Sequence, residues 1–173
     1  TFITGSTGKG KSTAIYSILD KLLTHNVKGK DEKIKFMVIE PAKGEYKNRF
    51  GNYDNVHVYG TNYKKMPLLK INPFSFPDDI HVLEHIDRLI EIFNVCWPMY
   101  AAMPAVLKDS IERAYFVSGW NLETSECRYQ DTKGNPLYPS FIDVLHQINK
   151  VMDDSAYSAD SKGDYKGALC TRL

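Results

Sequence analysis

The eight residues from Gly5 to Ser12 place two glycines, a lysine and a hydroxyl side chain in the spacing G-x-x-x-x-G-K-[ST], with a third glycine between them. Glycine adopts backbone conformations closed to other residues, so successive N–H groups of such a segment can converge on one anion. An ammonium and a hydroxyl beside this turn suit phosphate oxygens and a magnesium ion, respectively. The spacing therefore predicts a loop that cradles phosphate groups.

Each residue type in this loop has an expected duty toward ATP and Mg²⁺. The backbone from Gly5 to Gly10 cradles the phosphates, Lys11 pairs with the β- and γ-phosphate oxygens, and Ser12 coordinates Mg²⁺. The helix that follows directs the positive end of its dipole at the same anion. The predicted nucleotide-binding residues are Gly5, Ser6, Thr7, Gly8, Lys9, Gly10, Lys11, Ser12 and Thr13.

Hydrolysis also requires a carboxylate that helps to hold the metal or to orient the attacking water. Glu40 is the best candidate, because it follows the apolar run 36–39 at the end of a predicted strand. Ligands bind at the carboxyl ends of the strands in open parallel sheets. Glu40 is accordingly predicted as a catalytic residue beside Lys11, near the metal directly or through water. The alternative is a surface glutamate at a strand end.

The elements that must position these residues alternate between strands and helices. Strands are predicted at 2–4, 34–39, 56–59 and 68–71, and a helix over 11–24. Helices are also expected from Asp78 or Asp79, from Pro104, from Ser140 and from near Gly163. We predict an α/β protein with an incomplete P-loop parallel-sheet core over 1–77, an α-helical insertion over 78–153, and a truncated helix over 154–173 that returns to the core.

Composition limits the class of protein. The 173 residues carry a formal net charge of +1, but residues 1–70 hold 13 basic against 6 acidic side chains and residues 71–173 hold 9 against 15. The basic part contains the phosphate loop and favours a polyanionic ligand, although solvated surface lysines would give the same balance. Three widely spaced cysteines indicate a reducing cytoplasm, and no apolar run is long enough to span a membrane.

Four segments resemble the HerA/FtsK superfamily of hexameric, RecA/FtsK-like motor ATPases, and specifically its HerA-like branch. The phosphate loop resembles the family's Gly-x-Thr-Gly-x-Gly-Lys-Ser form, and residues 40–46 are similar to its Asp-Pro-x-Gly-Glu-Tyr motif. Residues 71–74 are similar to its strand that ends in Asn-Pro-Phe. Residues 165–173 are similar to a helix that precedes its Walker B strand.

The resemblance implies a ring-forming, homohexameric ATPase that uses ATP and Mg²⁺ to move on double-stranded DNA, beside a nuclease or another effector. Glu40 departs from the family's usual Asp, and one extra residue separates it from Gly44. The Walker B acid pair and the arginine that reaches a neighbouring subunit find no counterpart, and Arg172 is a weak substitute. The chain is therefore expected to be an excerpt that hydrolyses ATP poorly alone.

Two other classes of protein compete with this interpretation. A kinase of small molecules or nucleotides would keep the phosphate loop, but its arginine-rich lid is not matched between residues 78 and 120, where only two arginines occur. A nucleotide sensor without turnover is a variant of the same idea. A zinc metalloprotease would use His81, Glu84 and His85, which match H-x-x-E-H, but no second motif offers a third ligand.

Overall fold

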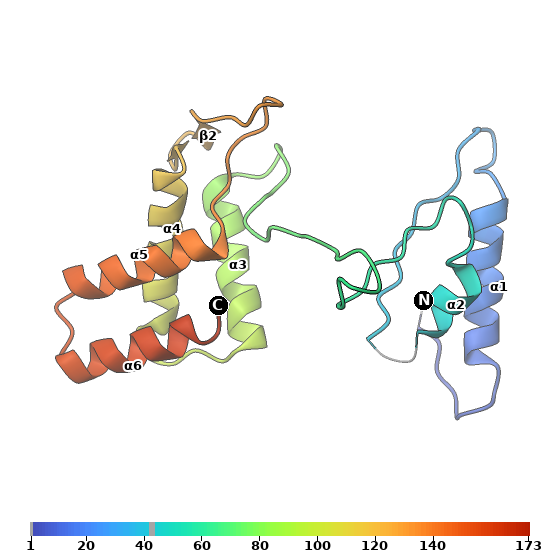
Figure 1. Cartoon of the computed structure of the whole chain (residues 1–173), viewed down its shortest axis with the longest axis horizontal. Coiled ribbons are helices and arrows are strands. Elements are labelled where there is room, and N and C mark those ends of the chain that lie inside the picture. Colours follow the sequence, from blue (N-terminus) through green and yellow to red (C-terminus); the bar gives the residue numbers. More distant parts are fainter. Residues whose placement is uncertain (1, 42–43) are drawn as a thin grey trace. The chain divides into compact units, whose positions relative to one another are not determined.

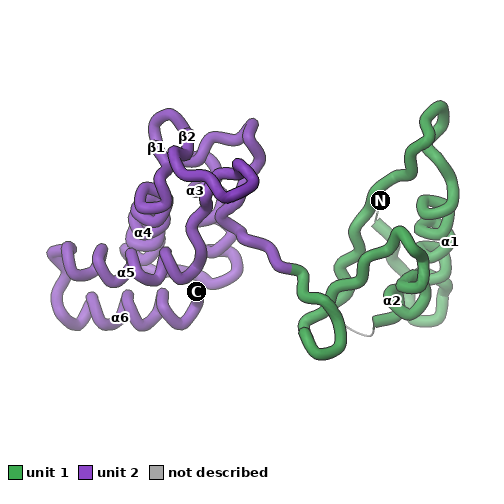
Figure 2. The backbone as a smooth tube through the Cα atoms, turned by 45° about the horizontal axis from the view of Figure 1, so that its top comes forward, with its two compact units in different colours: residues 1–69 green, residues 70–173 purple. Residues whose placement is uncertain are grey.

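The computed structural model describes residues 2–41 and 44–173. Contacts between Cα atoms divide the chain into two compact units, residues 1–69 and residues 70–173 (Figure 2). Unit 1 carries the phosphate loop, and unit 2 is mainly helical (Figure 1). The domain boundary predicted at residue 77 lies inside unit 2.

Unit 1 contains two helices, α1 (Lys11–Thr24) and α2 (Glu45–Phe50). The predicted bounds of α1 are confirmed, and α2 was not predicted. The helices pack through a small apolar cluster whose buried members are Leu19, Leu23 and Phe50. Around this cluster lie five half-buried side chains, Ile15, Tyr16, Leu22, Tyr46 and Val56. The cluster holds α2 against α1.

The four strands predicted between residues 2 and 71 are not found among the described residues. These segments form no ladder, apart from isolated bridges such as the parallel pair Gly60 and Leu68. Apolar side chains of the predicted strand 34–39 remain exposed, with Met37 at 74% and Ile39 at 78%. A strand needs a hydrogen-bonded neighbour, and residues 34–39 have none in the described part of unit 1. The described residues therefore do not show the predicted parallel-sheet core, and their one named sheet is the two-stranded hairpin of unit 2.

Unit 2 is built from four helices and one short hairpin. The helices are α3 (Val82–Cys96), α4 (Met103–Val117), α5 (Phe141–Asp154) and α6 (Ala159–Cys170). The antiparallel strands β1 (Trp120–Asn121) and β2 (Glu126–Cys127) follow α4. Helix α4 lies at the centre, because α3, α5 and α6 all pack against it (Figure 1).

Local sequence explains most of the helix ends in unit 2. Pro104 occupies the first turn of α4, and Gly119 follows its C-terminus with a φ of 97°. Ser140 and Asp143 form the predicted capping box of α5. Helix α3 starts at Val82 with His81 as its cap, not with Asp78 or Asp79. Its start is set by longer-range bonds to the hairpin, since the Val82 N–H donates to the Ser125 hydroxyl at 2.9 Å.

The segment 72–76 attaches the entry of unit 2 to three parts of that unit. Asn72 donates to the Pro139 carbonyl at 2.9 Å, and the His85 ring bonds the Pro73 carbonyl at 2.9 Å. The Tyr115 hydroxyl donates to the carbonyl of Phe74, whose own side chain is completely buried. We call residues 72–76 the anchor segment. It joins α3, α4 and the residues that precede α5.

Candidate functional site

The phosphate loop lies between the extended segment that starts at Phe2 and the first turn of α1. Gly8 and Gly10 adopt left-handed conformations, with φ values of 79° and 78°. An L side chain is strained there, so glycine is required by the backbone itself. A Cβ atom built at either position would meet no heavy atom within 4 Å. The space beside the loop is therefore open to a ligand.

Lys11 turns its ammonium group back onto the loop. Its Nζ donates to the Gly5 carbonyl at 2.5 Å and to the Ser6 carbonyl at 2.8 Å. The side chain thus places a positive charge at the loop, as the motif predicts. If a nucleotide binds, its phosphate oxygens would accept hydrogen bonds from the Lys11 ammonium in place of these two carbonyls.

The start of α1 supplies further donors. Gly10 caps the helix without a side-chain hydrogen bond from the described residues, and the first turn holds no acidic side chain. Ser12 and Thr13 are exposed on this turn. The first N–H groups of a helix have no partner within the helix and carry its positive dipole end. Amides, ammonium and hydroxyls of this turn together fit the phosphates of a nucleotide and the coordination preference of Mg²⁺.

Glu40 lies at the start of α2. Its Oε1 accepts the Glu45 N–H at 2.8 Å, and its Oε2 accepts the Tyr46 N–H at 3.2 Å. The carboxylate therefore caps α2, which the sequence did not indicate. A carboxylate has about four acceptor positions, so these two bonds leave others for a metal-bound water or the attacking water. The part of the related motif at residues 42 and 43 lies outside the described residues.

Two tyrosine hydroxyls connect α1 with the residues of α2 and just beyond it. Tyr16 donates to the Glu45 carboxylate at 3.1 Å, and Tyr53 donates to the Asp20 carboxylate at 3.0 Å. Desolvation and the bond to Glu45 raise the pKa of the Tyr16 phenol, and the bond to Asp20 raises the pKa of the Tyr53 phenol. Both phenols are therefore protonated donors at neutral pH. Sequence reasoning missed these residues because tyrosine at helical spacing usually indicates core packing.

The residues of the suggested zinc motif have structural partners in unit 2. His81 accepts the Leu83 N–H at its Nδ1 and lies 3.2 Å from the Glu123 carbonyl through its Nε2. The Nε2 of His85 is 2.9 Å from the Pro73 carbonyl, and Glu84 pairs with Arg88. In the described ranges, no three His, Cys, Asp or Glu side chains gather as a metal site. The geometry speaks against the metalloprotease.

The Arg172 side chain folds back onto the C-terminal end of α6. Its Nη1 donates to the Ala168 carbonyl at 3.0 Å, beside the C-terminus of α6. A guanidinium in this place satisfies a carbonyl that has no partner within the helix. This contact gives Arg172 a capping function within unit 2.

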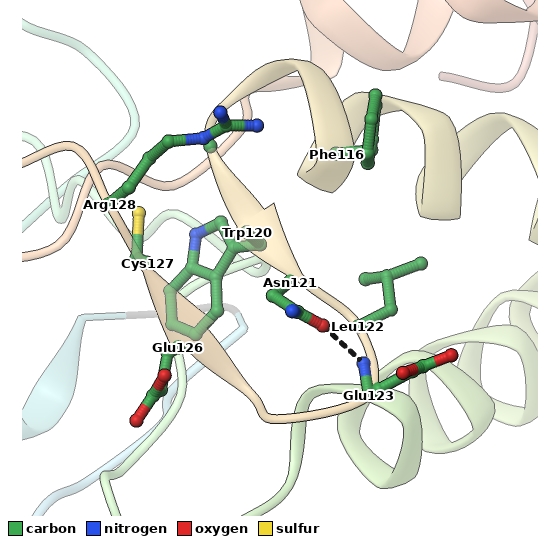
Figure 3. A pocket seen from close by; sticks show the side chains of 9 residues that line it. Phe116, Trp120, Asn121, Leu122, Glu123, Glu126, Cys127 and Arg128 are labelled. Atoms are coloured by element: carbon green, nitrogen blue, oxygen red, sulfur yellow. Dashed lines mark hydrogen bonds between the residues drawn. The ribbon is translucent and has the colours of Figure 1, made fainter.

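A hollow of about 890 Å³ lies in unit 2 (Figure 3), and none of the predicted nucleotide-site residues lines it. It is bordered by Phe116 on α4 and by the hairpin from Trp120 to Arg128. The Asn121 side-chain oxygen, which could have faced a ligand, accepts the backbone N–H groups of Glu123 and Thr124. The hollow is broad and combines apolar side chains with two glutamates and one arginine. Its chemistry is less specific than that of the phosphate loop, so we place the candidate site at the loop.

The loop and its helix have the arrangement that is typical of the P-loop class of proteins. The chain belongs to the family described as "Helicase HerA, central domain", whose profile matches residues 2–164. Membership indicates an ATP-binding ATPase domain and implies the use of nucleotide with Mg²⁺. No curated protein and no solved structure matches the chain significantly. The HerA-like resemblance is thereby confirmed, and the match includes three of the four segments noted in the sequence; residues 165–173 lie beyond it.

Proposed function

We propose that the chain is the ATP-binding portion of a hexameric motor ATPase of the HerA type that moves on double-stranded DNA. The observation that carries this proposal is the phosphate loop at the start of α1. There Lys11 lies against the Gly5 and Ser6 carbonyls, and Gly8 and Gly10 hold left-handed turns beside open space. The family of the chain supports an ATPase, and the resemblance supports DNA as its track.

Within this proposal, each residue has a defined task. The amides of residues 5–10 hold the phosphates, and Lys11 neutralises charge that develops on the β- and γ-oxygens. Ser12 contributes its hydroxyl to the metal, and Thr13 adds a second hydroxyl on the same turn. Mg²⁺ bound with ATP polarises the transferred phosphoryl group. Glu40 uses its remaining acceptor positions to orient a water molecule, while two of its bonds hold α2 in place.

The proposal includes a parallel sheet that involves the extended segments of unit 1. These segments are rich in apolar side chains, as is typical of strands that are buried on both faces of a sheet. Several of these side chains are exposed in the described structure. The isolated parallel bridge between Gly60 and Leu68 supplies one pair in the direction that such a sheet requires. Further strand pairing would bury these side chains and place Glu40 at the ligand-binding edge of the sheet.

The remaining parts of the proposal concern assembly and location. In a ring of identical subunits, an arginine of one subunit would reach the nucleotide of its neighbour, and a nuclease or other effector would use the movement on DNA. No described helix is both long and apolar enough to cross a membrane. The cysteine pattern favours the cytoplasm. The Lys11 experiment below tests the ATP site, on which all of these statements depend.

Replacing Lys11 by alanine tests the proposed nucleotide site. The change removes one charge-assisted contact, so we expect a loss of about 1.5–3 kcal/mol of ATP affinity, or roughly 10- to 150-fold. Isothermal titration calorimetry of the chain with ATP and Mg²⁺ measures this loss. Lys21→Ala is the matched control, because Lys21 lies in the last turn of the same helix. Equal ATP affinity in the wild type and Lys11→Ala would refute the proposal.

A further inference from the structure

We propose that Tyr16 is a positioning residue of the nucleotide site, which holds the helix that carries Ser12 in register with the helix that Glu40 caps. This inference rests on the proposed function. It starts from the spacing of Ser12, Tyr16 and Asp20, which places the three residues on one face of α1 at intervals of one turn. A shift of Tyr16 therefore displaces the serine hydroxyl one turn away.

Glu45 is the residue through which Tyr16 reaches Glu40. The Glu45 backbone N–H donates to the Glu40 carboxylate at 2.8 Å. The Glu45 side chain accepts the Tyr16 hydroxyl at 3.1 Å. One residue thus bonds the predicted catalytic carboxylate through its backbone and the phosphate-loop helix through its side chain. The path from Ser12 to Glu40 consists of one helical turn and two hydrogen bonds.

The ring of Tyr16 is held independently of its hydroxyl group. It packs edge-on against Tyr46 at 5.2 Å and against Phe50 at 5.9 Å between ring centroids. The Arg49 guanidinium lies over the ring at 5.6 Å from its centroid. These contacts remain when the hydroxyl is removed, so Tyr16→Phe breaks the bond to Glu45 and leaves the packing of α1 on α2 intact.

Loss of this bond should act on the metal more than on the phosphates. Lys11 and the loop amides contact phosphate directly and do not depend on α2. Ser12 and Glu40 are proposed to act through Mg²⁺ and its water, and their relative placement depends on the bond. Mutation of a residue that bonds a metal ligand typically lowers metal affinity or activity about 10- to 100-fold. Because this bond is exposed, its effect should be smaller than that range. We expect the gain in nucleotide affinity on adding Mg²⁺ to be about three- to tenfold smaller in Tyr16→Phe than in the wild type.

Titration with a fluorescent ATP analogue, in Mg²⁺ and separately in EDTA, tests the inference. Tyr16→Phe should weaken binding in Mg²⁺ and leave binding in EDTA unchanged. Tyr53→Phe is the matched control, because it removes a similar tyrosine–carboxylate bond to α1, at Asp20, that does not involve Glu45 or Glu40. This control should behave as the wild type in both titrations.

The possible results separate the two proposals. Wild-type binding that gains nothing from Mg²⁺ would overturn both the metal site and the inference. If the wild type responds to Mg²⁺ and Tyr16→Phe matches it, only the positioning role of Tyr16 fails. Equal losses in Tyr16→Phe and Tyr53→Phe would also overturn that role, because they would reflect general weakening of the contact between α1 and α2.

Discussion

Substitution of Tyr115 by phenylalanine probes the attachment of the anchor segment to α4. The Tyr115 hydroxyl donates to the Phe74 carbonyl, and both residues are fully buried. Burial also raises the pKa of this phenol, so it is a protonated donor throughout the neutral range. The substitution keeps the aromatic ring and opens no large cavity. It leaves a buried carbonyl without its partner, which costs about 1–3 kcal/mol.

Urea unfolding followed by tryptophan fluorescence measures this cost in unit 2 alone. Both tryptophans of the chain, Trp97 and Trp120, lie in unit 2, and the Trp120 ring centroid is 5.8 Å from that of Tyr115. A loss of about 2 kcal/mol should lower the urea midpoint by roughly 1 M for a slope of about 2 kcal/mol per M. The slope itself should not change.

Two further substitutions calibrate the result. Tyr138→Phe removes a longer bond of 3.2 Å to the Phe76 carbonyl in a half-buried place, so its effect should be smaller. Tyr100→Phe alters a side chain that is 70% exposed and should leave the midpoint unchanged. If Tyr115→Phe shifts the midpoint no more than Tyr100→Phe, the bond to Phe74 does not stabilise unit 2 and our reasoning about the anchor segment is wrong.

Unit 2 should lose stability in mild acid through His85, because burial lowers the pKa of this imidazole below its ordinary value of 6.5. The unfolded chain then binds a proton first, so the free energy of unfolding falls as the pH drops below about 6.5 and levels off below the folded pKa. Urea midpoints at pH 7.5 and 5.5 should differ less in His85→Gln than in the wild type; equal pH dependence in the two proteins would contradict this. Gly119→Ala should destabilise unit 2 by more than Gly134→Ala, since both glycines have positive φ but only at Gly119 would the new Cβ lie 2.4 Å from the Tyr129 ring. Backbone strain alone accounts for about 1–2 kcal/mol at Gly134, and equal losses of stability at the two positions would show that the Tyr129 ring moves aside.

Helices were predictable where their ends are set by neighbouring residues. The bounds of α1 follow from the glycine before it and the periodic apolar residues within it. The capping box at Ser140 fixes the start of α5, and Pro104 marks the first turn of α4. Helix α6 starts at Ala159, four residues before the predicted start near Gly163, because the Ser158 side chain caps it. The apolar pattern of this helix is weak and did not indicate the earlier start.

Features that depend on distant residues were not predictable. His81 caps α3 in place of the stronger cap formers Asp78 and Asp79, because the hairpin residues Glu123 and Ser125 bond this turn. Strand pairing depends on which segments lie side by side, and the apolar composition of one segment does not identify its partner. The pattern at 34–39 predicted a buried strand, but these residues form no strand and their side chains are exposed.

The candidate site shows the same division. Residues 5–13 follow from a motif whose chemistry is local, and the structure places the Lys11 ammonium at the loop. Glu40 was found from its place after an apolar run, but its bonds to the α2 backbone were not foreseen. The short α2 has no periodic signal, since it spans only six residues. Tyr16 and its partner Glu45 could be recognised only after α2 was known.

The anchor segment also determines how unit 2 would respond to mechanical load. Tension applied to the chain at residue 70 meets the bonds of Asn72, Pro73 and Phe74 within three consecutive residues, and each bond ends on a different part of unit 2. Because the three bonds lie on adjacent residues, we expect them to share the load. The helices of unit 2 would therefore be displaced as a block before the chain peels away from them.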